Sequence, residues 1–378
     1  MTLLVSGCST TIKSFFDEGE STEGRNEKLV SEDFKEETDV FNKFKEKEIA
    51  KPQETFPKVK EGVSKKIIKT KTTEKKKITS SGVRKAIRPV RTKRKIIPLE
   101  NMKTGKVKRA KVTTTKEEPT FEEIYPEDYP EKLKKHDESS NSFWSDFSPV
   151  LFTGEKYVFN ITYLGVNTGK ITISTKRETQ IGDNFAYHVN ARVKTADFYS
   201  YLYEIDDNCD SYIGKDLFLP LKFSLIQRQS SQDIDDLQLF DHDKMKAYSF
   251  YKRVTKKKKK KKKTSEFIPR YFQDPLSVIY FVRGLPMNSN KKYTIPIVNQ
   301  GKVEVLNAQY EKTEIIKTKL GKKKAFRVKI DTKHEGETIK GGSMIFWYSA
   351  DDKKMFLKFE AKIKIGSISG EIDSYKVH

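Results

Sequence analysis

The C-terminal part of the chain alternates apolar and polar residues, and this pattern restricts its fold more than any other feature. In the longest run, residues 357–365, Leu, Phe, Ala and two Ile residues fall on one face, with Lys or Glu between them. Shorter runs occupy residues 157–163, 187–193 and 303–305. A period of two predicts strands with one buried and one solvated face, which is typical of antiparallel sheets. We therefore expect residues 148–378 to form an all-β domain, an antiparallel curved sheet or barrel-like structure.

One segment of this region departs from the alternation and predicts a single short helix. Asp274 suits the N-cap position and Pro275 the first helical position, while Gly284 ends the pattern. The residues that share one helical face are Leu276, Ile279, Tyr280 and Arg283. A lone helix among strands is expected to brace the sheet.

Residues 9–147 predict a long disordered tether. Overall, 34% of the chain is charged and the formal net charge is +22. Lys, Glu, Thr and Ser dominate residues 9–147, and residues 58–116 are strongly basic, so burial cannot offset the entropy of ordering them. Basic residues near an anionic surface each gain about 1 kcal/mol. We expect anion contacts in the densest basic cluster, Arg91, Lys93, Arg94 and Lys95.

Residues 1–8 end in the form of a lipobox. The segment Leu4-Val5-Ser6-Gly7-Cys8 places small residues before a cysteine, the residue that accepts a diacylglycerol in exported bacterial lipoproteins. Because few residues precede it, we expect the natural start to lie upstream. The alternative is a chance cysteine in a polar N-terminus. Ser9 follows Cys8, and in Gram-negative sorting this favours the outer membrane, with the domain facing the periplasm.

Four short motifs of the β region resemble those of one family. They are Gly154-Glu155-Lys156-Tyr157 with Tyr163-Leu164-Gly165-Val166 and Gly169; Asp206-Asp207-Asn208-Cys209-Asp210-Ser211-Tyr212-Ile213; Gln273-Asp274-Pro275-Leu276-Ser277 with Tyr280 and Arg283; and Trp347-Tyr348-Ser349-Ala350-Asp351-Asp352 with Gly366-Ser367-Ile368. In this order they resemble the domain-of-unknown-function 3108 family of exported bacterial proteins, over about residues 150–375. The resemblance implies export and a β-rich fold, and supplies no activity.

The chain departs from that family in its basic tether and in an unbroken run of lysines. The run stands where the family has a short loop, so we expect a solvated loop with affinity for anions. The lysines of this run, all predicted anion contacts, are Lys256, Lys257, Lys258, Lys259, Lys260, Lys261, Lys262 and Lys263.

The sequence predicts no catalytic, metal or cofactor site. Asp241-His242-Asp243 lacks the glycine and glutamate of a calcium loop and indicates a hairpin turn. Adjacent Asp351 and Asp352 also favour a turn, and Cys209 has no histidine in motif context to activate it. Small β-barrels sometimes hold one apolar ligand. The aromatic residues that we expect to line such a pocket are Tyr163, Tyr201, Tyr280 and Trp347.

Three functional hypotheses remain open. The first is a non-catalytic outer-membrane lipoprotein whose β domain binds an apolar or glycan envelope component or a protein partner. The second is a structural tether that holds anionic lipid, lipopolysaccharide or acidic wall polymer through its basic segment. The third, a cytosolic nucleic-acid binder, requires that Cys8 be incidental, and we do not expect nucleic acid to be the partner.

Overall fold

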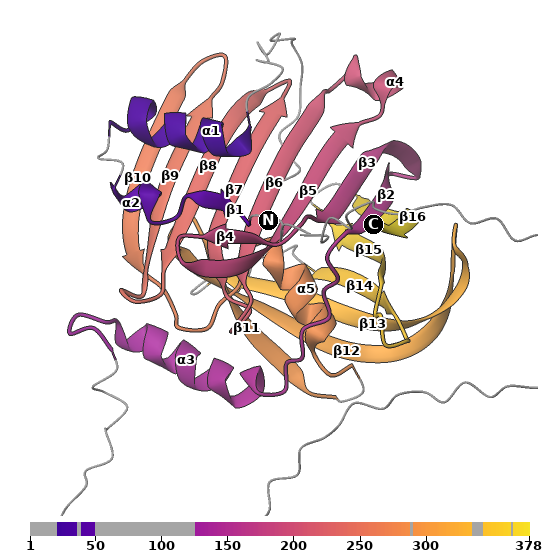
Figure 1. Ribbon diagram of the computed structural model, residues 1–378. Helices are drawn as coiled ribbons and strands as arrows, with labels where there is room; N and C mark the ends of the chain where they lie inside the picture. The colour runs from indigo at the N-terminus through magenta and orange to yellow at the C-terminus, as the bar shows by residue number, and fades with distance from the viewer. Residues whose placement is uncertain (1–20, 36–38, 50–124, 288–289, 335–342, 364–365) are drawn as a thin grey trace, which may run out of the picture. The chain divides into compact units, whose positions relative to one another are not determined.

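The computed structural model describes residues 21–35, 39–49, 125–287, 290–334, 343–363 and 366–378, and one large antiparallel sheet dominates them (Figure 1). The strands are β1 (Glu46–Glu48), β2 (Glu155–Tyr163), β3 (Val166–Thr175), β4 (Thr179–Ile181), β5 (Asn184–Thr195), β6 (Ile205–Gly214), β7 (Pro220–Gln229), β8 (Gln232–Asp241), β9 (Lys246–Val254), β10 (Lys259–Phe267), β11 (Lys292–Asn299), β12 (Lys302–Thr318), β13 (Gly321–His334), β14 (Ser343–Ser349), β15 (Phe356–Lys362) and β16 (Ser367–Val377). The helices are α1 (Thr22–Lys28), the π-helical turn η1 (Leu29–Asp33), α2 (Asp39–Asn42), α3 (Glu131–Trp144), α4 (Asp197–Ser200) and α5 (Ser277–Gly284).

The main sheet is a continuous ladder in the order β10-β9-β8-β7-β6-β5-β3-β2-β16-β15-β14-β13-β12-β11. Most neighbours are consecutive hairpins, and the last strand, β16, pairs with both β2 and β15 and so joins the two arms. β10 and β11 are the edges of this ladder and do not pair with each other, so the described sheet is open. The short strands β1 and β4 pair beside β5. These findings confirm the predicted all-β, antiparallel fold.

Helix α5 is the predicted helix, but it begins at Ser277, so Asp274 and Pro275 precede it and do not occupy the predicted N-cap and first helical positions. The Asp274 carboxylate accepts hydrogen bonds from the backbone N–H groups of Leu276 and Ser277, each at 2.7 Å. These bonds satisfy donors that a helix N-terminus otherwise leaves unpaired. The helix then packs Val278 and Phe281 into the main core.

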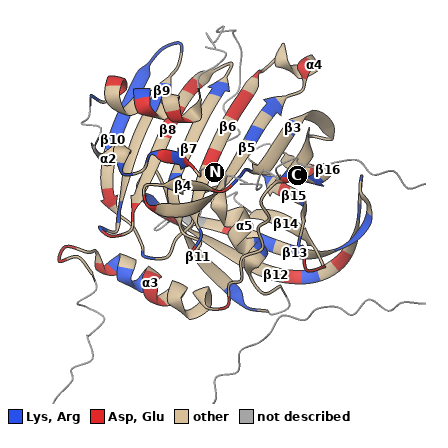
Figure 2. Ribbon diagram, viewed as in Figure 1, with Lys and Arg blue, Asp and Glu red and all other residues tan. Residues whose placement is uncertain are grey.

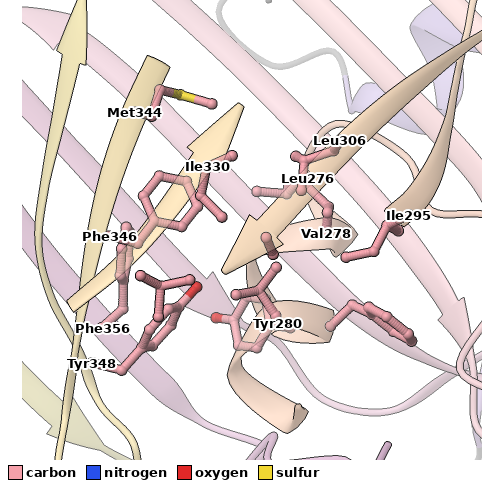
Figure 3. Packing of buried hydrophobic residues seen from close by; sticks show 14 of the residues in the cluster. Leu276, Val278, Tyr280, Ile295, Leu306, Ile330, Met344, Phe346, Tyr348 and Phe356 are labelled. Atoms are coloured by element: carbon pink, nitrogen blue, oxygen red, sulfur yellow. The ribbon is translucent and has the colours of Figure 1, made fainter. Parts of the chain in front are cut away.

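The main core lies between α5 and the sheet. Figure 3 shows the α5 side chains Val278 and Tyr280 facing Ile295, Phe346 and Tyr348 of the strands. Burying a side chain of this size contributes about 1.5–3 kcal/mol. Much of the sheet's buried apolar surface therefore packs around helix α5.

A buried ion pair fixes α5 to β2. Arg283, in the last turn, donates two parallel hydrogen bonds to Glu155, at 2.8 and 2.9 Å. Their side chains are 2% and 0% exposed. The Tyr157 and Tyr375 hydroxyls also donate to Glu155, each at 2.9 Å, so this buried carboxylate is well satisfied.

Residues 21–49 correct the prediction of an uninterrupted tether over residues 9–147. The described parts of this segment, here called the strap, form α1, η1, α2 and β1 and pack on β5–β9. Leu29, Val30, Phe41 and Phe44 of the strap are buried in a second apolar cluster against this sheet face. α3 likewise packs on the β domain, next to β11. The ordered domain therefore begins well before residue 148, whereas residues 50–124 lie outside the described residues.

Charged pairs hold the strap in addition to this apolar cluster. Glu23 pairs with Lys222, whose side chain is 0% exposed, and Asp33 pairs with Lys252. Burial raises the pKa of Glu46, but hydrogen bonds from His188 and Tyr212 outweigh it and lower the pKa to about 2. The strap is polar in composition, and its burial depends on these long-range partners.

The lysine run is an edge strand rather than the expected loop. Lys256–Lys258 form the turn, and the remaining lysines begin β10, which pairs with β9 from Lys259↔Val254 to Phe267↔Lys246. Backbone pairing is indifferent to side-chain charge, and a strand with solvated lysines blunts edge-to-edge association. Figure 2 shows this basic strand at the edge of the sheet.

Candidate functional site

A groove lies between α3, β10 and the β11–β12 hairpin, and it is here called the lysine groove. Its volume is about 660 Å³, within the range of about 300–1,000 Å³ that is usual for ligand sites. The residues that line it are Pro130, Lys132, Leu133, Lys262, Thr264, Glu266, Phe267, Gln300, Gly301, Lys302 and Val303. Three elements far apart in the sequence thus form one concave surface.

Positive charge exceeds negative charge in this groove. Lys132, Lys262 and Lys302 line it, against the single acid Glu266. The N-terminus of α3, where Pro130 supplies no side-chain cap, lies in the same wall. A helix N-terminus carries a partial positive charge, so both features favour an anion.

The hairpin tip is held in place from β8. Gln300 and Gly301 have φ values of +53° and +71°, the left-handed geometry of a tight two-residue turn. The backbone N–H of Gln300 donates to Gln238 at 2.8 Å, and its side-chain amide donates to Asp236 at 2.9 Å. Lys302 therefore projects from a fixed tip rather than from a loose loop.

Asp236 is a buried carboxyl directly behind this tip. It is 2% exposed, and its Oδ1 accepts no hydrogen bond from the described residues. Burial raises the pKa of Asp236 to about 7, against the opposing effect of hydrogen bonds from Gln300 and Gln238. The charge of Asp236 therefore changes near neutral pH, and Asp236 contacts the groove through its hydrogen bond from Gln300.

The α3 wall rests on a small cluster of its own. Tyr129, Leu133 and Met245 are buried together, with Phe267 and Val303 packed against them. The Tyr129 hydroxyl donates to Asp137 at 2.8 Å, and Asp137 also accepts from the backbone N–H of Arg270 at 2.6 Å. These contacts position Lys132 opposite β10.

Of the predicted anion contacts, the structure brings only Lys262 into the groove. Lys259 and Lys261 pair with Asp33 of the strap, at 3.6 and 2.8 Å. The other lysines of the run are exposed. The remaining predicted contacts and the predicted lipidation site lie outside the described residues: Arg91, Lys93, Arg94, Lys95 and Cys8.

The four aromatic residues of the predicted apolar pocket do not meet. Tyr201 is 91% exposed beside α4. Trp347 donates to Glu314 at 2.8 Å, on the face of β14 opposite its neighbour Tyr348, because side chains alternate along a strand. Tyr163 ends β2, and only Tyr280 lines an internal cavity. That cavity is about 10 Å³, room for roughly one water molecule.

The acidic segment predicted to be a turn is one. Asp241 accepts the backbone N–H of Lys244 at 3.1 Å, and Lys43 of the strap pairs with Asp241 and Asp243, at 3.0 and 3.4 Å. Within the described ranges, no group of three or more His, Cys, Asp or Glu residues is placed to hold a metal ion. Burial raises the pKa of the Cys209 thiol well above its usual value.

Sequence reasoning missed Lys132, Lys302 and Glu266. Their only local signal is the Asn299–Lys302 turn and the start of α3 at Pro130, and neither indicates that the two segments meet at β10.

No helix of the described residues is long and apolar enough to cross a bilayer. An open antiparallel sheet packed on α5, with a polar groove at its edge, defines an all-β domain. The family model of the protein of unknown function DUF3108 matches residues 158–373, more than half of the chain. The chain belongs to this family, as its motifs predicted.

Three solved structures are similar to this chain. A β-barrel-like protein of the domain of unknown function DUF1849 from Brucella abortus is 10% identical, with a TM-score of 0.41 over 59% of this chain and 97% of its own. A protein assigned as exported, with a YmcC-like fold, from Bacteroides fragilis is 12% identical, with a TM-score of 0.28 over 61% and 98%. A protein assigned as a lipoprotein from Parabacteroides distasonis is 11% identical, with a TM-score of 0.28 over 61% and 99%. No curated protein matches the sequence.

Proposed function

We propose that this chain is a non-catalytic cell-envelope lipoprotein, anchored through Cys8, whose β domain binds an anionic envelope component in the lysine groove. The observation that carries the proposal is the groove itself. A volume of about 660 Å³ is lined by three lysines, one acid and the N-terminus of α3. Anionic groups on a glycan, phosphates above all, complement such a surface.

The groove favours a polar ligand over an apolar one. Gln300, Thr264 and the lysines provide hydrogen-bond donors along its walls. The internal cavity beside Tyr280, at about 10 Å³, holds no lipid chain. A phosphorylated envelope glycan, such as the core oligosaccharide of lipopolysaccharide, carries the negative charge that the groove favours.

The path of the chain weighs against the tether alternative. The strap, on one side of residues 50–124, and Tyr125, on the other, both contact the β domain. A segment whose two ends rest on one domain cannot carry that domain away from its anchor. Its basic residues instead add anion affinity to the chain.

The test measures binding of deacylated, phosphorylated core oligosaccharide to the full chain by isothermal titration calorimetry. Cys8→Ala removes the lipidation site. In this background, Lys262→Gln with Lys302→Gln is compared with Lys317→Gln and Lys322→Gln, two exposed lysines paired at the far end of β12 and β13. Both variants lose two positive charges, so the nonspecific electrostatic attraction of the oligosaccharide to the whole chain falls equally in the two.

We expect the groove variant to bind about tenfold more weakly than the control variant, a difference of ~1.4 kcal/mol. Enzymatic removal of the phosphates should abolish the difference. Equal dissociation constants for the two variants would show that the groove is not the binding site.

A further inference from the structure

Five exposed apolar side chains gather on two neighbouring connections of the sheet. Leu164 and Val166 belong to the β2–β3 hairpin, and Phe198, Tyr201 and Leu202 to the α4 connection between β5 and β6. Phe198, Tyr201 and Leu202 are 77%, 91% and 73% exposed. Single exposed apolar residues need no explanation, but a cluster marks a contact surface. These five residues are here called the apolar tip.

The two connections lie side by side because their strands pair. β3 pairs with β5 from Gly169↔Thr195 onward, and the backbone N–H of Ala196 donates to Thr168 at 2.9 Å. Figure 1 shows α4 at the end of β5 and β6. The apolar tip therefore lies at one end of the paired strands β3, β5 and β6.

Hydrogen bonds hold α4 in the conformation that exposes these residues. The Tyr203 hydroxyl bonds to Gln229 and Ser231 of the β7–β8 connection, at 3.1 and 2.7 Å. The backbone N–H of Glu204 donates to Ser230 at 2.8 Å. With the backbone held in this way, the exposed apolar side chains contact water at a cost in free energy.

Charged residues of both signs flank the tip. The bases include Lys170, Arg192, Lys194 and Lys362, and the acids include Asp197, Glu204 and Asp206. Arg192 and Lys194 both pair with Asp206, at 2.8 and 3.2 Å. A partner of this surface is therefore recognised by apolar contact, and its binding should respond weakly to salt.

The strap places the N-terminal end of the described chain near this tip. Thr22, the first residue of α1, accepts a hydrogen bond from Asn208 at 3.3 Å. Asn208 lies near the start of β6, the strand that follows α4. Residues 9–20 separate Cys8 from Ser21, which at full extension reach about 45 Å. A lipid on Cys8 would hold this end of the domain beside the bilayer.

We propose that the apolar tip inserts into the interfacial zone of a lipid bilayer. Phe and Leu supply apolar area, and Tyr combines an apolar ring with a hydroxyl that stays in water, as at membrane interfaces. Glu266 and Phe267 of the lysine groove pair with the first residues of β9, Ala247 and Lys246. The β7–β8 connection, beside the apolar tip, lies at the other end of β9, where Asp233 pairs with Val254. The insertion would thus turn the groove away from the membrane.

The proposal does not depend on ligand binding by the groove, and its test does not depend on the acyl anchor. The full chain with Cys8→Ala is mixed with phosphatidylcholine vesicles in 0.5 M salt, where the basic segment contributes little (a Debye length of about 4 Å). Binding is measured by co-sedimentation. The tip variant, Phe198→Ser with Tyr201→Ser and Leu202→Ser, is compared with a control, Phe185→Ser with Leu217→Ser and Ile315→Ser, which removes exposed apolar residues elsewhere.

We expect the parent and control proteins to partition onto the vesicles, and the tip variant to partition at least about tenfold less. In a separate variant, Phe198→Trp, tryptophan emission should shift to the blue with vesicles and be quenched by brominated lipid. Equal partitioning of the tip and control variants would overturn the proposal. So would a concentration-dependent dimer, seen by analytical ultracentrifugation without lipid and abolished in the tip variant, because the tip would then bind a second copy.

Discussion

Replacing Arg283 by Met should be among the most destabilising single changes in this domain. Arg283 donates two hydrogen bonds to Glu155 and two more to the backbone carbonyl of Lys353, at 2.6 and 3.1 Å. Methionine fills a similar volume but donates nothing. Glu155 would keep its bonds from Tyr157 and Tyr375 but lose its countercharge while 0% exposed.

Removing one partner of a buried ion pair costs about 3–5 kcal/mol, because the other charge stays buried without compensation. A typical domain has a total unfolding free energy of about 5–15 kcal/mol. We therefore expect the urea midpoint of Arg283→Met, followed by circular dichroism and tryptophan fluorescence, to fall by a large fraction.

A double-mutant cycle separates the ion pair from simple loss of packing. In Glu155→Gln with Arg283→Met, no uncompensated charge remains, so the double variant should be more stable than Arg283→Met alone. A loss below about 1 kcal/mol for the single variant, or a double variant no more stable than the single, would refute this reasoning.

Three further predictions concern the groove and the strap. Burial raises the pKa of Asp236 from 3.8 to about 7, so its protonated form is favoured in the folded state; this stabilisation is complete below pH 4 and is lost as the pH rises through 7. Asp236→Asn should flatten that part of the stability profile in urea titrations at pH 5 to 8, and an unchanged slope would assign it to other carboxyls. Glu23→Gln leaves the buried Lys222 ammonium without its acid and should loosen the strap, seen as faster amide hydrogen exchange in residues 21–49 with β12–β14 unchanged as an internal control. Phe41→Ala, at a side chain 1% exposed, should cost about 3–5 kcal/mol of strap docking, measured by the same exchange, and protection equal to the parent would contradict the described packing.

Periodicity predicted the elements whose burial is decided locally. The run at residues 357–365 gives β15, in which Leu357 and Ala361 are buried while Lys358 and Glu360 pair with each other at 2.8 Å. Helix α5 was predicted from the helical spacing of Leu276, Ile279 and Tyr280 and from Asp274 and Pro275 before it. In both places, neighbouring residues carry the whole signal.

Features that depend on distant partners were beyond such reasoning. The strap was predicted to be part of a disordered tether because Glu23 and Asp33 are typical of solvated segments. The sequence does not show that they pair with Lys222 and Lys252 of the sheet. The lysine run was predicted to be a loop because β10 pairs with β9 through backbone groups, and the side-chain pattern of a lysine run gives no sign of that pairing. The four aromatic residues predicted to line a pocket lie apart for a related reason, since residue type alone does not show which face or turn a side chain occupies.

The route of the strap makes this domain a two-piece structure on one chain. Residues 50–124 are the only covalent link from the strap to the rest of the domain, and a protease that cut within them would leave residues 21–49 bound as a separate peptide. Retention at the membrane would then be an equilibrium, set by how tightly Phe41, Phe44 and their neighbours stay in the cluster on β5–β9. Before cleavage, the covalent link gives the strap a high effective concentration at its site; after cleavage, dissociation separates the β domain from the strap. If Cys8 carries the proposed lipid anchor, a single cut within residues 50–124 would convert a membrane-held domain into a freely diffusing one.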